Sequence, residues 1–329
     1  MKISYNEELY IEKEELYIKT RFNNEIYTSI LEIRKDPITG FKVRINRNIK
    51  NKPRNIINEN IENNECIFCN HEKYVTSFFD FEKIYNSNSV LFANKYPYSE
   101  YHGVVLLNYN KHNENFSDIS LLDLYNSLEL IREFYNKIFE KNNEYNILFI
   151  NLNKGFSAGA SQRHLHFQIL VEKEPTNYYK IYLNKCKRYF EKYRKFFIED
   201  YFLFEKKLNE RIIYDDIIKL WSNFAPFRNN EIIGYFDTFG LFFLNQNKFE
   251  DLVSKLYKIL VLYEKLYNEF NLTILDTTNL KESRTFPFIR IAQRNKNDIG
   301  YMEIFHIEPV ISSIPEETSK EIKEKLSNQ

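Results

Sequence analysis

Cysteine is scarce in this sequence, which excludes one common way of stabilising a chain. Three cysteines occur among 329 residues, too few for the disulfide framework of small secreted proteins. An excess of one charge is also lacking, because 46 Lys and Arg residues balance 46 Asp and Glu residues. A chain without a basic excess creates no field that attracts nucleic acid. We therefore expect neither a disulfide-rich fold nor a nucleic-acid partner.

Long apolar runs are missing as well. No segment approaches the roughly 20 apolar residues that a membrane-spanning helix requires. The opening residues, MKISYNE, lack the apolar core of a signal peptide. We therefore expect a cytoplasmic protein with no membrane partner. At this length the chain can bury one large core or two smaller ones.

Small residues gather in one loop, residues 153–163, with the sequence NKGFSAGASQR. Gly155 and Gly159 can adopt positive φ values, which lets backbone N–H groups approach a ligand closely, as anion-binding loops require. The loop is therefore predicted to hold an anion. Because GxxxG alone has little specificity, this prediction depends on the residues that come directly after the loop.

Residues 164–168 alternate between polar and apolar side chains. In a strand this alternation places His164, His166 and Gln168 on one face, with Leu165 and Phe167 packed behind them. Two imidazoles and an amide beside an anion-binding loop predict chemistry at a phosphorus atom. The alternative is that the histidines are only packed or surface residues. Against it, the chain has only six histidines and two of them meet here.

The sequence CIFC at 66–69 is a second candidate site. A pair of cysteines at this spacing is half of a metal site, a redox pair, or neither. Cys186 is distant and lies in a predicted helix, so histidines are the natural partners. The coherent metal option is therefore a zinc site with two cysteines and two histidines.

The same order of elements, strand, helix, strand, strand, is predicted twice. The first run is 103–108, 117–141, 146–152 and 164–168, and the second is 232–237, 249–270, 272–275 and 286–292. The repeat predicts an internal duplication. It favours an α+β fold with two halves, residues 1–175 and 176–329, each of antiparallel sheet with packed helices.

Other elements are predicted from local signals. Pro37 and Gly40 predict a turn before a strand at 41–47, whereas residues 1–32 give only weak strand signals. Residues 48–64 are polar and predict a mobile loop. A further helical region is predicted at 176–199.

The helix at 117–141 has two candidate caps, Ser117 and Asp118. Its apolar stripe is expected to begin at Leu121 and Leu122.

Four stretches, taken in order, carry a family resemblance. They read DPITG at 36–40, CIFC at 66–69, NKY at 94–96 and NKGFSAGASQRHLHFQ at 153–168. The chain resembles galactose-1-phosphate uridylyltransferase and its relatives in the histidine-triad superfamily, and fainter similarity continues through 221–227. The resemblance implies two histidine-triad-like halves, of which the first carries the catalytic and zinc residues.

The resemblance also implies roles for individual residues. His166 matches the nucleophile that accepts the nucleotidyl group, Gln168 the amide that binds a phosphate oxygen, and Ser161 another phosphate contact. The residues that fall in stretches lining the nucleotide are Asn94, Asn153, Gly155 and Gly159. Gln168 is typical of the transferase branch, since the hydrolases of the superfamily have a third histidine at this position.

The metal set implied by the resemblance is Cys66, Cys69, His112 and His164. Four protein ligands close a tetrahedral site, so the zinc ion is expected to be structural. His71 is the rival third ligand, although its closeness to Cys69 strains a tetrahedral arrangement.

Three departures separate the chain from the family pattern. Leu165 stands where the family usually has proline, which is expected to loosen the loop. The basic residues after the DPITG turn, Arg47, Lys50 and Lys52, match only approximately. The histidine cluster of a second metal site is absent, and residues 286–290, analogous to the histidine pair, contain no histidine.

The resemblance implies a nucleotidyltransferase that moves a nucleoside monophosphate, through His166, between a nucleoside-diphosphate sugar and a sugar 1-phosphate. Its partners would be small molecules, nucleotide sugars and sugar phosphates, and a homodimer is allowed. One alternative is a phosphorylase in which inorganic phosphate accepts the nucleotide from an ADP-sugar or a diadenosine polyphosphate. Another is a nucleotide-binding protein without turnover.

Overall fold

The computed structural model describes residues 1–22, 25–46, 66–74, 78, 83–95, 97, 99–277, 279–280, 284–295 and 300–327. Tyr96 and the predicted loop at 48–64, with the basic residues Arg47, Lys50 and Lys52, lie outside the described residues.

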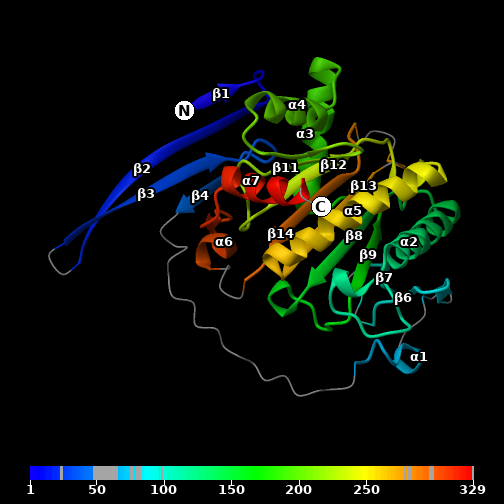
Figure 1. Cartoon of the computed structure of the whole chain (residues 1–329). Helices are drawn as coiled ribbons and strands as arrows, with labels where there is room; N and C mark the ends of the chain where they lie inside the picture. The colour runs from blue at the N-terminus through cyan, green and yellow to red at the C-terminus, as the bar shows by residue number, and fades with distance from the viewer. Residues whose placement is uncertain are drawn as a thin grey trace.

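The described residues form helices, strands and short 3-10 turns (Figure 1). The helices are α1 (His71–Tyr74), α2 (Leu121–Lys141), α3 (Asn177–Tyr193), α4 (Phe197–Leu208), α5 (Gln246–Tyr267), α6 (Tyr301–Phe305) and α7 (Pro315–Leu326). The strands are β1 (Lys2–Ser4), β2 (Tyr10–Phe22), β3 (Glu25–Lys35), β4 (Lys42–Asn46), β5 (Ile84–Tyr85), β6 (Val90–Ala93), β7 (Tyr101–Leu106), β8 (Ile147–Lys154), β9 (His166–Glu172), β10 (Ile212–Asp215), β11 (Ile218–Ser222), β12 (Ile232–Phe236), β13 (Phe270–Asp276), β14 (Phe288–Gln293) and β15 (Val310–Ile311). The 3-10 turns are η2 (Phe116–Asp118), η3 (Phe156–Ala158) and η4 (Leu241–Phe243).

A ten-stranded antiparallel sheet dominates the molecule. Its order is β10-β11-β12-β14-β13-β8-β9-β7-β6-β5, so β5 to β9 form one side and β10 to β14 the other. The two sides meet where β8 pairs with β13, with Asn151 opposite Thr273. The predicted α+β fold with two similar antiparallel halves is confirmed. A boundary at residue 175, in the connection between β9 and α3, remains our proposal.

The two faces of the large sheet differ in what covers them. Helices α2 and α5 cover one face and bury an apolar cluster that includes Leu165 and Phe167. Helices α3 and α4 pack on part of the opposite face, over residues such as Phe149 and Phe288. A polar region lies on this same face, between the cluster under α3 and α4 and a smaller apolar cluster around Val104. This polar region holds the candidate site.

The N-terminal strands β1 to β4 form a second sheet of five strands with β15, from near the C-terminus, in the order β1-β2-β3-β4-β15. Strands β2 and β3 form a long hairpin that extends away from the rest of the molecule, drawn in blue in Figure 1. The weak strand signals of residues 1–32 therefore correspond to real strands. The predicted turn before β4 is confirmed: Asp36 accepts hydrogen bonds from Thr39, and Gly40 has a φ of 78°.

Helix α2 begins later than predicted. Ser120, not Ser117 or Asp118, is the cap, and its Oγ accepts a hydrogen bond from the backbone N–H of Asp123. Residues 116–118 form η2 instead. Because of this later start, Leu121 and Leu122 are 40% and 57% exposed, so placing them in the apolar stripe was wrong. The buried apolar residues of α2 are Leu124, Leu128, Leu130, Ile131, Phe134, Tyr135 and Ile138.

Candidate active site and metal centre

His166, the first residue of β9, is buried on the polar part of the sheet face. Its Nδ1 lies 2.7 Å from the main-chain oxygen of His164. A carbonyl oxygen can only accept, so Nδ1 carries the proton and Nε2 keeps its lone pair. Burial lowers the pKa of His166, which favours the neutral ring. His166 thus has the protonation state of a nucleophile before any substrate binds.

Gln168 lies two residues further along β9, on the same face. Its Oε1 lies 3.0 Å from Nε2 of His102, which is also 3.1 Å from Nδ2 of Asn94. The structure thus brings together two residues expected at the site, Gln168 and Asn94, through a third that sequence reasoning missed. Alternation along residues 101–106 places His102 on the face of Val104 and Leu106, but its closeness to Gln168 follows only from the register between β7 and β9.

A row of polar side chains continues from Gln168 across the middle of the sheet. Asn151 pairs with Gln168 on the neighbouring strand, and its Oδ1 accepts a 2.8 Å hydrogen bond from Thr273. Asn153, another expected site residue, accepts a 2.7 Å hydrogen bond from Asn271. A cavity of about 390 Å³ opens over this row, with Phe227 at its wall. A cavity with both polar and apolar lining residues therefore lies on the same sheet face as His166.

The loop at 155–160 has the predicted backbone conformation, because φ is 87° at Gly155 and 89° at Gly159. Its N–H groups, however, are already used. Those of Phe156 and Ser157 donate to the carboxylate of Glu269, each at 3.1 Å. Those of residues 158–160 donate to carbonyls of the loop itself. The prediction that these amides form an anion-binding site was therefore wrong, because an internal carboxylate occupies that position.

Ser161, the remaining expected residue, is exposed on the loop before β9. Asn94 follows β6, and its backbone N–H donates to the carbonyl of His102 at 2.8 Å. Asn94 therefore borders the polar face that carries His166, and Ser161 lies on the loop that leads into β9. Their contacts with a phosphate or a nucleotide remain predictions.

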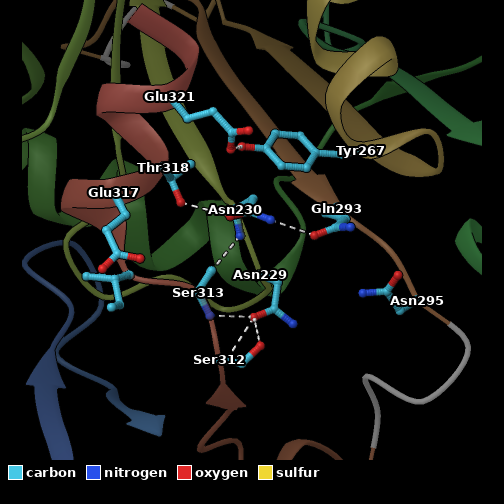
Figure 2. A pocket seen from close by; sticks show the side chains of 11 residues that line it. Asn229, Asn230, Tyr267, Gln293, Asn295, Ser312, Ser313, Glu317, Thr318 and Glu321 are labelled. Atoms are coloured by element: carbon cyan, nitrogen blue, oxygen red, sulfur yellow. Dashed lines mark hydrogen bonds between the residues drawn. The ribbon is translucent and has the colours of Figure 1, made fainter. Parts of the chain in front are cut away.

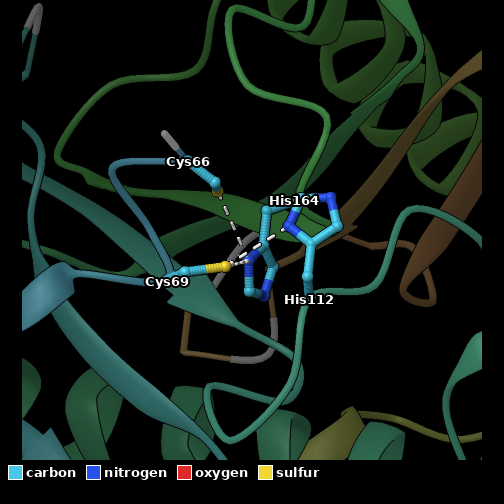
Figure 3. A group of neighbouring side chains, drawn as sticks. All are labelled: Cys66, Cys69, His112 and His164. Carbon is cyan, nitrogen blue, oxygen red and sulfur yellow. Dashed lines mark hydrogen bonds between the residues drawn. The ribbon is translucent and has the colours of Figure 1, made fainter. Parts of the chain in front are cut away.

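Four side chains converge just before the first residue of β9, as Figure 3 shows: Cys66, Cys69, His112 and His164. Their ligand atoms all lie within 4.8 Å of one another. Nδ1 of His164 is 3.8 Å from Sγ of Cys66 and 3.7 Å from Sγ of Cys69, and Nδ1 of His112 is 3.3 Å from Sγ of Cys69. Zinc bonds of about 2.0–2.3 Å in a tetrahedron separate the ligand atoms by about 3.3–3.8 Å. The four predicted ligands therefore have the spacing of a zinc site.

Both imidazoles of this group are oriented by their other ring nitrogen. Nε2 of His164 lies 3.0 Å from the carbonyl oxygen of Asn108, and Nε2 of His112 lies 3.1 Å from a carboxylate oxygen of Glu114. Each Nε2 therefore donates its proton to oxygen, which leaves Nδ1 unprotonated and facing the thiols. Outer hydrogen bonds of this kind fix the orientation of metal-binding histidines.

The Cys69 thiol needs a nearby cation to ionise at neutral pH. Burial and the neighbouring Cys66 thiol raise the pKa of Cys69 to about 11, whereas a bound metal ion deprotonates a coordinating thiol. The rival ligand His71 is outside the group and lies in α1, with its ring 5.3 Å from that of Tyr109. The residues present fit zinc.

Leu165, where the family pattern has proline, ties the two sites together. Its N–H donates to the carbonyl of Asn113 at 2.8 Å, next to His112. Proline has no N–H and could not make this bond. The expectation that Leu165 loosens the loop was therefore wrong.

A second cavity, of about 590 Å³, contains none of the predicted site residues. Its polar side chains bind one another, as Figure 2 shows: Asn230 donates to Gln293 at 2.6 Å and accepts from Thr318 at 2.8 Å. The hydroxyl of Tyr267 donates to Glu321 at 3.1 Å. These bonds join α7 to α5 and β14, which is a structural role.

The sequence is similar to a protein family and to a protein from an archaeon, neither of which has a described function. A model of the N-terminal domain of DUF4931, a domain of unknown function, matches residues 43–174. An uncharacterised protein of Archaeoglobus fulgidus is 25% identical over 328 residues, which cover 95% of this chain and 97% of that protein. Within the described residues, no helix combines the length and apolar character needed to cross a membrane.

Three solved structures are similar to the chain along most of its length. An ADP-glucose phosphorylase from Arabidopsis thaliana with bound ADP-glucose has a TM-score of 0.72 and 21% identity, covering 89% of this chain and 99% of that one. A GalT-like protein from the same plant has a TM-score of 0.69 and 22% identity, covering 89% and 98%. A uridylyltransferase has a TM-score of 0.64 and 17% identity, covering 90% and 98%. The chain therefore has the GalT-like fold of these proteins.

Proposed function

We propose that the protein is a nucleotidyltransferase in which His166 carries a nucleoside monophosphate as a covalent intermediate. The donor is a nucleoside-diphosphate sugar and the acceptor a sugar 1-phosphate. The observation that carries this proposal is the 2.7 Å hydrogen bond from His166 Nδ1 to the His164 carbonyl, which leaves Nε2 ready to attack.

The proposed reaction has two balanced steps. In the first, the Nε2 lone pair forms a bond to the α-phosphorus while the bond to the bridging oxygen breaks, and the sugar 1-phosphate leaves. In the second, an oxygen of the acceptor phosphate attacks the same phosphorus and the N–P bond breaks. Neither step activates water, so the residue at position 168 need not act as a general acid or base. The amide of Gln168, which neither gains nor loses a proton near neutral pH, is therefore compatible with both steps.

Gln168 and Ser161 would donate hydrogen bonds to the phosphate oxygens on which charge develops. Asn94, Asn153, Gly155 and Gly159 would line the nucleotide. The cavity of about 390 Å³ beside β8 has the position and the amide and hydroxyl groups to hold the sugar of the donor or acceptor. Asn153 would then border both the nucleotide and the sugar, since it also lines this cavity.

Cys66, Cys69, His112 and His164 would hold a zinc ion with no open position, which supplies structure rather than reactivity. His164 also provides the main-chain carbonyl that binds His166, so the proposed metal site and the nucleophile are adjacent along the backbone. His164 itself, with its ring turned to the thiols, would not substitute for His166.

A phosphorylase is the second candidate, with inorganic phosphate as the acceptor. The fold similarity to an ADP-glucose phosphorylase favours it. Both reactions share the first step and differ only in which oxygen attacks the intermediate. A product assay with UDP-glucose or ADP-glucose as the donor, and with inorganic phosphate and galactose 1-phosphate as acceptors, separates them.

The proposal is tested by incubating the purified protein with UDP-glucose, ADP-glucose and diadenosine tetraphosphate, each labelled at the α-phosphorus. We expect acid-labile label on the protein from at least one donor, and no label on a His166→Gly variant. Nucleotide binding without label in the wild-type protein would contradict the covalent route and indicate a binding protein without turnover.

A further inference from the structure

His102 lies beside the proposed catalytic residues but has no role in the proposed reaction. It is on β7, where Val104, two residues on, pairs with Gln168, so the imidazole and the Gln168 amide are neighbours on one sheet face. The side chain is only 1% exposed, and its Nε2 is 3.0 Å from Oε1 of Gln168. A buried polar group held this close to a site residue restrains that residue.

The usefulness of Gln168 depends on which way its amide is held. Phosphate oxygens accept hydrogen bonds, so the NH₂ group of the amide stabilises them and its carbonyl oxygen does not. The two orientations have nearly the same shape and differ mainly in hydrogen bonding. The neighbour that binds one end of the amide therefore decides which end faces the substrate.

Nε2 of His102 can be used in two ways. It can donate its proton to Oε1 of Gln168, or it can accept a hydrogen bond from Nδ2 of Asn94 at 3.1 Å, but one nitrogen cannot do both. Donation to Gln168 holds the carbonyl on the side of His102 and turns the NH₂ group away from it. Acceptance from Asn94 would favour the opposite orientation of Gln168.

We propose that His102 is a positioning residue, whose Nε2–H binds Oε1 of Gln168 and so presents the amide NH₂ group to the α-phosphate. The inference rests on the proposed function and specifies how one of its residues is oriented. The Nδ2 group of Asn94 lies 3.1 Å from the same nitrogen, so the proposal requires the Asn94 amide to be turned over, with its oxygen accepting from Nε2–H.

The test is a double-mutant cycle with His102→Leu and Gln168→Ala. We expect Gln168→Ala to reduce nucleotidyl transfer by roughly 10²–10³-fold, as for one lost oxyanion donor. His102→Leu should reduce it by about tenfold, the effect of losing one hydrogen bond. The double variant should be no slower than Gln168→Ala alone, because His102 acts only through Gln168.

Conservative and control variants make the cycle decisive. His102→Gln, whose amide N–H can reach the position of Nε2, should recover most of the rate, and His306→Leu, at an exposed histidine, should have no effect. If His102→Leu lowers the melting temperature markedly, the cycle is repeated with His102→Asn. The asparagine side chain is polar, which suits the buried position, but it is too short to reach Gln168.

Binding of AMP and UMP, measured by calorimetry, gives a readout that does not depend on turnover. We expect His102→Leu to weaken binding in the wild-type background and not in the Gln168→Ala background. The proposal would be overturned if the two substitutions lowered the transfer rate by independent factors that multiply in the double variant. It would also be overturned if His102→Leu bound nucleotide more tightly and transferred it faster. A wild-type protein that binds these nucleotides but never becomes labelled would refute the covalent mechanism while leaving His102 testable. A wild-type protein that neither binds these nucleotides nor becomes labelled would refute both the covalent mechanism and the role of His102.

Discussion

At the scale of single residues, the main-chain carbonyl of His164 already determines the tautomer of His166. Nδ1 donates at 2.7 Å, so the attacking nitrogen needs no separate base. We expect His166→Gly to abolish nucleotidyl transfer, and added imidazole to restore part of it by occupying the vacated space. The measurement is transfer rate against imidazole concentration. Full activity without imidazole would contradict a nucleophilic role, and unchanged circular dichroism and zinc content would show that only the nucleophile was lost.

The metal site gives a second prediction at this scale. Cys66→Ala removes one of four closed ligands, so zinc measured by elemental analysis should fall from about one ion per chain to near zero. Cys186→Ala is the matched control, because Cys186 is buried in the core around α3 and lies outside the ligand group. Equal zinc content in the two variants, or no zinc in the wild-type protein, would end the assignment.

Sequence reasoning found the residues of the site better than their surroundings. The family resemblance, starting from the cysteine pair, implied four metal ligands whose side chains do meet in space. It missed His102, because its closeness to Gln168 depends on the register between β7 and β9. It misjudged the loop amides, because Glu269 reaches them from 113 positions along the chain. Contacts between distant segments are what a local pattern cannot supply.

At the scale of elements, two glycines inside strands of the large sheet have very different surroundings. A Cβ at Gly234 on β12 would lie 1.9 Å from the carbonyl oxygen of Lys219, whereas a Cβ at Gly103 on β7 would have no neighbour closer than 3.6 Å. We expect Gly234→Ala to lower the free energy of unfolding by about 1–3 kcal/mol, the usual cost of overpacking. Gly103→Ala should be neutral or slightly stabilising, since it removes backbone freedom from the unfolded chain.

Urea denaturation of the two variants under identical conditions checks this contrast. Similar stabilities for Gly234→Ala and Gly103→Ala would mean that β11 and β12 separate easily, contrary to their paired register.

The strands and helices themselves were largely predictable, and the exceptions have local causes. The apolar periodicity of α5 identified a helix at 249–270, and the structure has it at Gln246–Tyr267. The start of α2 was misplaced because three candidate caps lie within four residues, and only Ser120 has Asp123 at the spacing of a reciprocal cap. The strand signals of β2 and β3 were weak because both strands are rich in charged residues.

At the scale of the whole molecule, one carboxylate joins three parts of the structure. Glu316 on α7 binds Arg34 of β3 at 2.9 Å and Arg211, just before β10, at 2.7 Å. Both arginine side chains are almost fully buried, at 2% and 1% exposure. Hydrogen bonds and charge from Arg34 and charge from Arg211, acting against burial, lower the pKa of Glu316 from 4.5 to about 2.

This shift predicts how stability depends on pH. A lowered pKa in the folded state stabilises the protein above pH 4.5, and this stabilisation is lost as the pH falls toward 2. The shift corresponds to about 3 kcal/mol. We expect Glu316→Gln to be less stable than the wild-type protein by at least this order at pH 7, with the difference shrinking below pH 4. Glu324→Gln, at an exposed position of α7, is the control. A pH-independent difference would contradict the assignment.

The hydrogen bond from Leu165 to Asn113 also has an evolutionary consequence. It fastens the segment around His112 to the segment before β9 through the main chain, and the His164 carbonyl that orients His166 is likewise main chain. Neither bond depends on a thiol or on the identity of side chain 164. A lineage of this chain could therefore lose its metal ligands one substitution at a time and still inherit a correctly oriented nucleophile.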